Sequence, residues 1–324
     1  MADLAHIAVV GAGLMGHGIA QVFAVAGHPV TVTDPSAEAL ASLRGRIAAN
    51  LIDLGQDAAA AQQVAQRVTP LADLAPAVAR ADVVFEAGPE NLGFKQRLFA
   101  ELEALCPAHT LLASNTSVIP ITAIMQGLKT GHRALGTHWW NPPYLVPLVE
   151  VIRTPETDPA LAQRMADLLA AVGKTPALVA KDVPGFIGNR LQHALWREAV
   201  ALVADGVCDA ATVDTVVKAS FGRRLPVLGP LENADLVGVD LTQAIHQTVL
   251  ADLNRDTAPN AYLQQLMDQG RLGMKTGQGF RAWTPGEQAA LRARVLAHLK
   301  AMNAAEAAAE RVAEHPADVT APPR

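Results

Sequence analysis

Short runs of apolar and β-branched residues alternate with helical periodicity through the first half of the chain. The helical patterns cover Gly11–Ala26, residues 36–67 with a break near Gly55, and Phe94–Leu105. Alternation of this kind predicts a parallel sheet with helices on both faces. The runs that predict its strands are Ile7–Val10, Val30–Thr33, Asp82–Ala87, Thr110–Ala113, Ala134–Thr137 and Leu148–Ile152.

The pattern changes near Pro184. Beyond this point apolar residues recur about once per helical turn, and strand patterns are almost absent. We therefore expect an α/β domain over residues 1–186 and an all-helical domain over residues 187–303. Residues 304–324 are expected to form a tail that begins as an Ala/Glu helix and becomes disordered from about residue 315.

Composition and charge narrow the function classes. The formal net charge is -5 and no long basic run occurs, which argues against nucleic acid as a partner. No apolar run reaches the ~18 residues of a membrane span, and the polar start Met1–His6 is too short for a signal peptide. The two cysteines, Cys106 and Cys208, lie far apart in no metal-like spacing. We expect no disulfide and no metal site, and place the protein in the reducing cytoplasm.

A glycine motif follows the first predicted strand. The segment Gly11-Ala12-Gly13-Leu14-Met15-Gly16 has the spacing of a dinucleotide-binding turn, in which glycines permit a tight turn and close approach of the pyrophosphate. Asp34 follows at the end of the second strand, where a carboxylate accepts hydrogen bonds from ribose hydroxyls. No arginine occupies positions 35–37, so the pattern favours NAD over NADP. The first domain is therefore predicted to be a Rossmann-type doubly wound sheet.

Three further segments carry polar side chains at places where chemistry is expected. Ser114-Asn115-Thr116-Ser117 and His138-Trp139-Trp140-Asn141-Pro142 each follow or end an apolar strand. Glu150 lies inside a predicted strand between two valines. Ligands of open α/β sheets bind outside the carboxyl ends of the strands, and a buried carboxylate needs a partner. These segments are thus candidates for an active site.

Together these motifs resemble the L-3-hydroxyacyl-CoA dehydrogenase family. That family has S-N-T-S, then H-F-F-N-P, then a glutamate twelve residues after the histidine, the spacing of His138 and Glu150 here. Lys181–Arg190 resembles its K-D-x-P-G-F-x-x-N-R segment, and Met274–Phe280 resembles its K-T-G-x-G-F segment. The resemblance spans roughly residues 5–285 in order.

The resemblance implies a role for each matching residue. His138 is expected to take the proton of the substrate hydroxyl, with Glu150 holding its other ring nitrogen. Ser117 and Asn189 are expected to hydrogen-bond the substrate oxygen. The resemblance further implies a homodimer, a small-molecule substrate and a place in fatty acid metabolism. The residues it implies around the cofactor, beyond the glycine loop and Asp34, are Glu90, Lys95, Asn115, Ser117, Asn141 and Lys275.

The sequence departs from the family in the helical stretch after the second strand. Acyl-CoA enzymes usually carry several lysines there, whereas residues 36–67 contain none and balance three arginines against three acidic residues. The motif Pro142-Pro143-Tyr144 resembles the sequences of two branches of the family. One is the lambda-crystallin/L-gulonate dehydrogenase branch and the other is the branch acting on a pyridine carboxylate. The substrate is therefore either a 3-hydroxyacyl-CoA or a small free hydroxy acid.

Two other functions compete with this reading. One is a non-catalytic NAD-binding protein of the crystallin kind, which would not require an intact set of His138, Glu150, Ser117 and Asn189. The other is a lysine-catalysed β-hydroxyacid dehydrogenase, which also pairs a glycine motif with a helical domain. That mechanism needs a lysine four residues before the asparagine, where this chain has Gly185.

Overall fold

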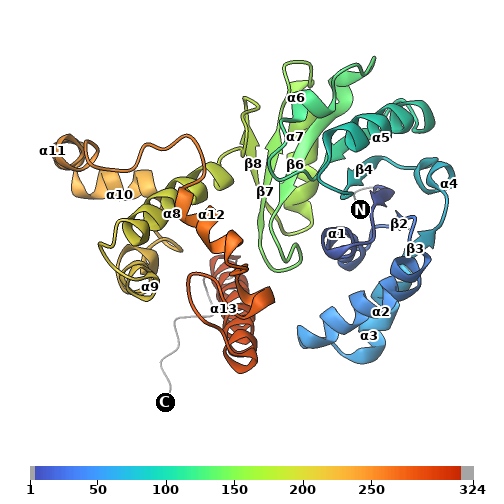
Figure 1. Ribbon diagram of the computed structural model, residues 1–324. Coiled ribbons are helices and arrows are strands. Elements are labelled where there is room, and N and C mark those ends of the chain that lie inside the picture. Colours follow the sequence, from blue (N-terminus) through green and yellow to red (C-terminus); the bar gives the residue numbers. More distant parts are fainter. Residues whose placement is uncertain (1–3, 315–324) are drawn as a thin grey trace. The chain divides into compact units, whose positions relative to one another are not determined.

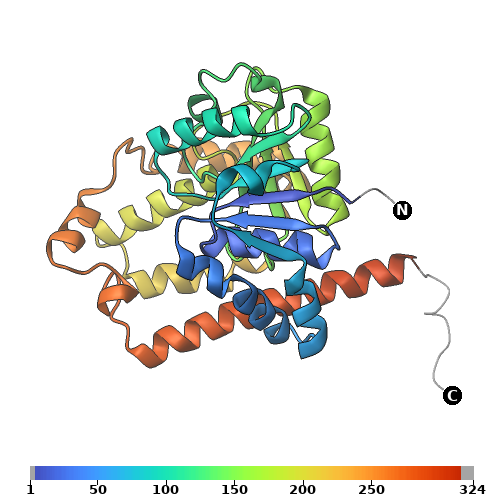
Figure 2. The same cartoon turned by 90° about the vertical axis from the view of Figure 1, so that its right-hand side faces the viewer.

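The structure is a computed structural model that describes residues 4–314 (Figures 1 and 2). Its contacts divide the chain into two units. Unit 1 comprises residues 1–189 and 297–324, and unit 2 comprises residues 190–296. The predicted disorder from about residue 315 lies outside the described residues.

Unit 1 is built on one eight-stranded sheet, with the strand order β3-β2-β1-β4-β5-β6-β7-β8. All neighbouring strands are parallel except β6 and β7, which are antiparallel. The order reverses between β1 and β4, as in other doubly wound sheets. The strands are β1 Ile7–Val10, β2 Val30–Thr33, β3 Val68–Leu71, β4 Val83–Glu86, β5 Leu111–Ser114, β6 Ala134–Trp139, β7 Leu148–Ile152 and β8 Thr175–Val179.

Helices cover both faces of this sheet because its strands are apolar on both sides. In β4, Val83 and Phe85 point into one core with α1, α2, α3 and α7, whereas Val84 points into a second core with α5 and α6. The predicted α/β fold with a doubly wound sheet is confirmed. The helices of this part are α1 Leu14–Val25, α2 Ala37–Asp53, α3 Ala58–Gln66, α4 Leu74–Val78, α5 Leu92–Leu105, α6 Ile121–Ile124 and α7 Pro159–Ala171, with the 3-10 turn η1 Gly131–Arg133.

Unit 2 is helical, as predicted, and the described residues after β8 form no further strand beyond isolated bridges near Gln278. Its elements are α8 Gly188–Ala204, α9 Ala210–Ala219, η2 Phe221–Arg223, α10 Pro230–Val237, α11 Val239–Val249, α12 Ala261–Asp268, η3 Met274–Thr276 and α13 Pro285–Glu314, the long red helix of Figure 2. The unit boundaries fall inside α8 and α13.

The end of α13 extends into the region expected to form a helical tail from residue 304. It is one continuous helix, and from residue 297 it groups with unit 1. The reason is local bonding: Lys300 Nζ lies 2.8 Å from Asp53 Oδ2, and Asn303 Nδ2 donates to the Leu145 carbonyl at 2.9 Å. None of the helices in the described residues is long and apolar enough to span a bilayer.

Candidate active site

The predicted dinucleotide loop connects β1 to α1. Gly11 has a φ of +108°, and a Cβ atom there would lie 2.6 Å from the carbonyl oxygen of Ala87 at the end of β4. The loop therefore lies where the strand order reverses. Gly13 is exposed, offers no side-chain cap to α1, and a Cβ at Gly13 would meet no atom within 4 Å. The first turn of α1 thus has room for a pyrophosphate against its N–H groups.

Asp34 and Arg46 hold this loop from the neighbouring elements. The Ala12 N–H donates to Asp34 Oδ2 at 2.7 Å, and the Ser36 N–H donates to Oδ1 at 2.8 Å. Arg46 Nη2, from α2, donates to the Ala12 carbonyl at 2.7 Å. A carboxylate offers about four acceptor positions, so Asp34 keeps capacity for ribose hydroxyls while it anchors the loop.

A fully buried ion pair lies at the end of β4. Lys95 Nζ, from α5, is 2.6 Å from Glu86 Oε1, and both side chains are 0% exposed. Glu86 also accepts hydrogen bonds from the Ser114 hydroxyl at 2.6 Å and from the Gly88 N–H at 2.7 Å. Because isolated buried charges are costly, each partner requires the other. Lys95, which was expected at the cofactor, is thus fully buried and paired with Glu86.

Glu90 connects this ion pair to the strand end after β5. Its Oε2 lies 3.6 Å from Lys95 Nζ, and its Oε1 accepts the Thr116 hydroxyl at 2.5 Å and the Ser117 N–H at 3.0 Å. Burial favours the neutral acid, but these donors outweigh it and hold the pKa of the Glu90 carboxyl below its usual value. Glu90 is thus an anion with a 39% exposed side chain near the carboxyl ends of β4 and β5.

His138 and Glu150 face each other across the antiparallel pair β6 and β7. They are direct partners in the register, and His138 Nδ1 lies 2.7 Å from Glu150 Oε2. Both are buried, with exposed fractions of 4% and 1%. The predicted spacing of twelve residues is thus the length of a β-hairpin that returns Glu150 to His138.

Glu150 is held as an anion. Its second oxygen, Oε1, accepts the backbone N–H groups of Ile187 at 2.8 Å and Gly188 at 3.0 Å. Burial alone would raise the pKa of Glu150, but the bond to His138 and these two N–H donors outweigh it and lower the pKa. A carboxylate fixed in this way can orient an imidazole and stabilise its charged form.

Ser117 and Asn189, the two residues predicted to bind the substrate oxygen, meet in unit 1, and the predicted cofactor residues Asn115, Asn141 and Lys275 are placed separately. Asn189 Nδ2 donates to the Ser117 carbonyl at 2.8 Å, which joins the start of α8 to the segment after β5. Asn115 Oδ1 accepts the Trp139 N–H at 3.0 Å, next to His138 in the chain. Ser117 and Asn141 are both exposed at the carboxyl ends of strands. Lys275 belongs to unit 2, where it is exposed in η3.

Two residues with clear contacts here were not among the predicted site residues; His17 was expected to be structural or solvent-exposed. Glu86 ends an apolar strand, and a charged residue in that position is a sequence signal for a buried, paired carboxylate. His17 lies four residues after Gly13, one helical turn away, and its Nδ1 is 2.9 Å from the Gly13 carbonyl oxygen. The bond of Glu86 to Lys95 and that of His17 to Asn50 depend on where α5 and α2 pack, which the sequence does not show.

Comparison with known proteins identifies the family. Residues 6–183 match the NAD-binding domain of 3-hydroxyacyl-CoA dehydrogenase, and residues 185–283 match its C-terminal domain. The chain belongs to this family. The matched first domain is the family's NAD-binding domain and the relatives are dehydrogenases, so this 3-hydroxyacyl-CoA dehydrogenase family member is an NAD-dependent oxidoreductase.

Its relatives differ in what their names say they act on. A 5-formyl-3-hydroxy-2-methylpyridine 4-carboxylate 5-dehydrogenase of Mesorhizobium japonicum is 36% identical, over 89% of this chain and 94% of that protein. An L-carnitine dehydrogenase of Streptomyces griseus is 40% identical over 73% of this chain and 70% of its own. Human mitochondrial hydroxyacyl-coenzyme A dehydrogenase is 35% identical, over 85% of this chain and 90% of that protein.

A solved structure has the same architecture over nearly its whole length. The crystal structure of a 5-formyl-3-hydroxy-2-methylpyridine 4-carboxylic acid 5-dehydrogenase, described as an NAD-dependent dismutase, superposes with a TM-score of 0.84 at 32% identity. It covers 93% of this chain and 97% of its own. The cofactor of this family member is accordingly NAD, and the open first turn of α1 beside Asp34 fits it.

Proposed function

We propose that this enzyme oxidises a secondary hydroxyl group to a ketone, with His138 as the base. The observation that carries the proposal is the 2.7 Å bond between His138 Nδ1 and Glu150, buried between the adjacent strands β6 and β7. Because Glu150 holds Nδ1, the other nitrogen, Nε2, is left to take the hydroxyl proton. Bound NAD supplies the acceptor for the hydride that leaves the same carbon. The proton and the hydride together account for the two hydrogens lost by the alcohol.

The remaining residues orient the reacting groups. Glu150 fixes the tautomer of His138 and stabilises the imidazolium that forms when the proton arrives. Ser117 and Asn189 are proposed to hydrogen-bond the substrate oxygen as it becomes a carbonyl. Asn115, Asn141 and Glu90 are proposed to line the nicotinamide side, and Lys275 is proposed as a cofactor residue on its match to the family alone.

The glycine loop and Asp34 are proposed to hold the adenosine end of NAD. Asp34→Ala removes the carboxylate that accepts ribose hydroxyls and repels a 2′-phosphate. We expect wild-type kcat/KM to favour NAD over NADP by about 10-fold or more, the value of a charged hydrogen bond, and the variant to narrow that ratio. Equal kcat/KM of the wild type for NAD and NADP would contradict the assignment. Since Asp34 also anchors Ala12, the variant should raise the KM for NAD as well.

A second observation favours a small free hydroxy acid over a CoA thioester. The segment from α2 through residue 67 lacks lysine, and its three arginines donate to backbone carbonyls: Arg44 to Val68, Arg46 to Ala12 and Arg67 to Ala24. A polyanionic CoA group would find these cations already engaged. The similarity to dehydrogenases of a pyridine carboxylate and of L-carnitine supports the same class.

A substrate screen tests the function and the class together. Reduction of NAD is measured with small hydroxy acids, including L-carnitine, L-gulonate and hydroxylated pyridine carboxylates, beside 3-hydroxyacyl-CoA thioesters. We expect turnover with a free acid. If a CoA thioester is the better substrate, the proposed substrate class is wrong, but the proposed dehydrogenase activity is supported. NAD binding without turnover of either class would favour the non-catalytic, crystallin-like alternative.

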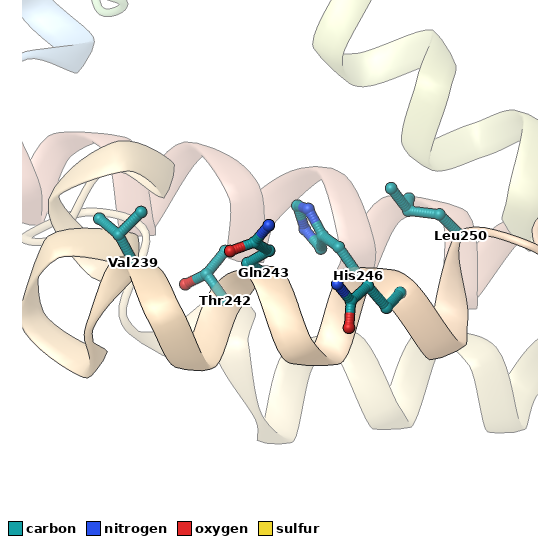
Figure 3. A pocket seen from close by; sticks show the side chains of 6 residues that line it. Val239, Thr242, Gln243, His246 and Leu250 are labelled. Carbon is teal, nitrogen blue, oxygen red and sulfur yellow. The ribbon is translucent and has the colours of Figure 1, made fainter.

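We also propose a homodimer formed through unit 2. Helices α10 and α11 carry large, solvent-exposed apolar side chains: Leu231, Leu236 and Val239 are 80%, 72% and 66% exposed. The face of α11 that bears Val239, His246 and Leu250 lines an open pocket (Figure 3). Exposed apolar surface of this kind is typical of an interface, and a second copy of the chain is its proposed occupant.

Light scattering at micromolar concentration measures this assembly. We expect the mass of a dimer for the wild type and a shift toward monomer for Leu231→Asp combined with Leu236→Asp, since both would bury a charge. Ile52→Asp, at an exposed position of α2 in unit 1, is the matched control and should stay dimeric. A monomeric wild type would contradict the proposal.

We propose a cytoplasmic location from the state of the cysteines, and the metabolic role depends on the substrate. Cys106 and Cys208 are both free, which fits the reducing cytoplasm. A role in fatty acid metabolism would apply only if the screen selected CoA thioesters.

A further inference from the structure

His17 lies in the first turns of α1, directly behind the dinucleotide loop. Its side chain is 6% exposed, and Nδ1 lies 2.9 Å from the carbonyl oxygen of Gly13. The same carbonyl already accepts the helical N–H of His17 at 3.2 Å. Gly13 has no side chain to cap the helix, so this second bond is an additional restraint on the peptide between Gly13 and Leu14.

Asn50 of α2 determines which nitrogen of His17 carries the proton. Asn50 Nδ2 lies 3.2 Å from His17 Nε2 and 2.9 Å from Gln21 Oε1, while Asn50 Oδ1 accepts the Tyr144 hydroxyl at 3.4 Å. With its amide nitrogen facing the ring, Asn50 donates and Nε2 accepts. Nδ1 therefore bears the hydrogen and donates it to the Gly13 carbonyl.

The electrostatic surroundings keep the ring neutral, as this bonding requires. Burial lowers the pKa of His17, and the nearby Arg46 charge lowers it further, against the raising effect of the Gly13 carbonyl. The neutral ring with hydrogen on Nδ1 is thus the form present near pH 7. A protonated ring would point a second N–H group at the Asn50 amide nitrogen.

Three side chains restrain the backbone of the dinucleotide loop. The carbonyls of Ala12 and Gly13 are bound from behind by Arg46 and His17, and the Ala12 N–H is bound by Asp34. A peptide whose carbonyl is held toward the protein presents the following N–H on its opposite side, where α1 is open. Pre-ordering of this kind removes part of the entropy cost of binding an anion there.

We propose that His17 is a positioning residue, which holds the Gly13–Leu14 peptide so that the first turn of α1 binds the pyrophosphate of NAD. The inference rests on the dinucleotide site proposed above. It assigns His17 to cofactor affinity and leaves the chemical step to His138.

The test compares two buried histidines of the same helix region. His17→Ala removes the bond to Gly13, whereas His28→Ala removes an equivalent 2.9 Å contact between Nδ1 and the Ala5 carbonyl, at the other end of α1. One neutral hydrogen bond corresponds to a 3- to 10-fold change in an equilibrium constant, as an order of magnitude. We expect Kd for NADH, from fluorescence titration, to rise about this much in His17→Ala alone. The affinity of His17→Ala for ADP-ribose, which keeps the pyrophosphate but lacks nicotinamide, should fall by the same factor.

Three further readouts separate positioning from general destabilisation. At saturating NAD the kcat of His17→Ala should equal that of the wild type. In the protein without cofactor, amide exchange at position 17, whose N–H donates to the Gly13 carbonyl at 3.2 Å, should speed up relative to the His28→Ala variant once the intrinsic rates of His and Ala are corrected for. Asn50→Ala should weaken NADH binding in the same direction, and adding it to His17→Ala should cause little further loss, because both act through one bond.

Equal losses of NADH affinity in His17→Ala and His28→Ala would overturn the inference, as would an unchanged Kd in His17→Ala. These outcomes leave the proposed function standing, since they presuppose a wild type that binds NADH. A wild type that binds neither NADH nor ADP-ribose would instead contradict the proposed dinucleotide site itself.

Discussion

Replacing His138 with glutamine should lower kcat by about 100-fold or more, since a positioned base is typically worth 10²–10⁴ in rate. The affinity for NADH should stay close to the wild-type value, because the glycine loop and Asp34 are untouched. Steady-state rates with the substrate found in the screen, beside a fluorescence titration with NADH, measure both quantities. A variant with near-normal kcat would contradict the base assignment and favour the non-catalytic alternative.

Glu150→Gln extends this prediction to the second member of the pair. The amide keeps the shape of the side chain but removes the charge that stabilises the imidazolium, so kcat should fall by about 10-fold or more. Because the two residues act as one unit, the double variant should be little slower than His138→Gln alone. Losses that multiply in the double variant would show that the two side chains act independently.

The second large effect concerns stability, at the buried pair of Glu86 and Lys95. Lys95→Met should lower the free energy of unfolding by about 3–5 kcal/mol, because it leaves the Glu86 carboxylate buried without its cation. Urea unfolding of the protein without cofactor measures this change. Since Glu86 also accepts from Ser114 and Gly88, the effect should extend to the strand end that carries Asn115 and Ser117.

A compensating variant distinguishes loss of charge balance from loss of packing. Glu86→Gln added to Lys95→Met removes the unpaired charge and should recover most of the lost stability. If Lys95→Met alone costs less than about 1 kcal/mol, the pair is not the buried ion pair described. No recovery in the double variant would mean that the methionine, rather than the charge, disturbs the core.

The parts of the fold that the sequence predicted are those with local signals. The strands from Ile7–Val10 to Leu148–Ile152 were readable because runs of β-branched residues are bounded by turns. Strands β3 and β8 were missed, and both lie at the edges of the sheet. Each is interrupted by a proline, Pro70 or Pro176, which a sheet tolerates at an edge and which breaks the strand pattern.

The candidate site also has parts that could be predicted from the sequence and parts that depend on how the helices pack. The pairing of His138 with Glu150 was expected from the resemblance to the family, and the hairpin between β6 and β7 brings the two residues together. The roles of Glu86 and His17 depend on helices α5 and α2, whose positions no local pattern specifies. Lys95 was expected beside the cofactor from its match to the family alone, and only the packing of α5 shows its bond to Glu86.

The central claim is that His138 accepts the substrate proton as hydride is transferred to NAD. Steady-state rates can report product release, so the most direct measurement is a single turnover with enzyme in excess of substrate and NAD saturating. We predict that the wild type forms NADH in a fast phase and that His138→Gln forms it at least about 100-fold more slowly, at equal NADH affinity. A fast phase of the same rate in both proteins would contradict the account.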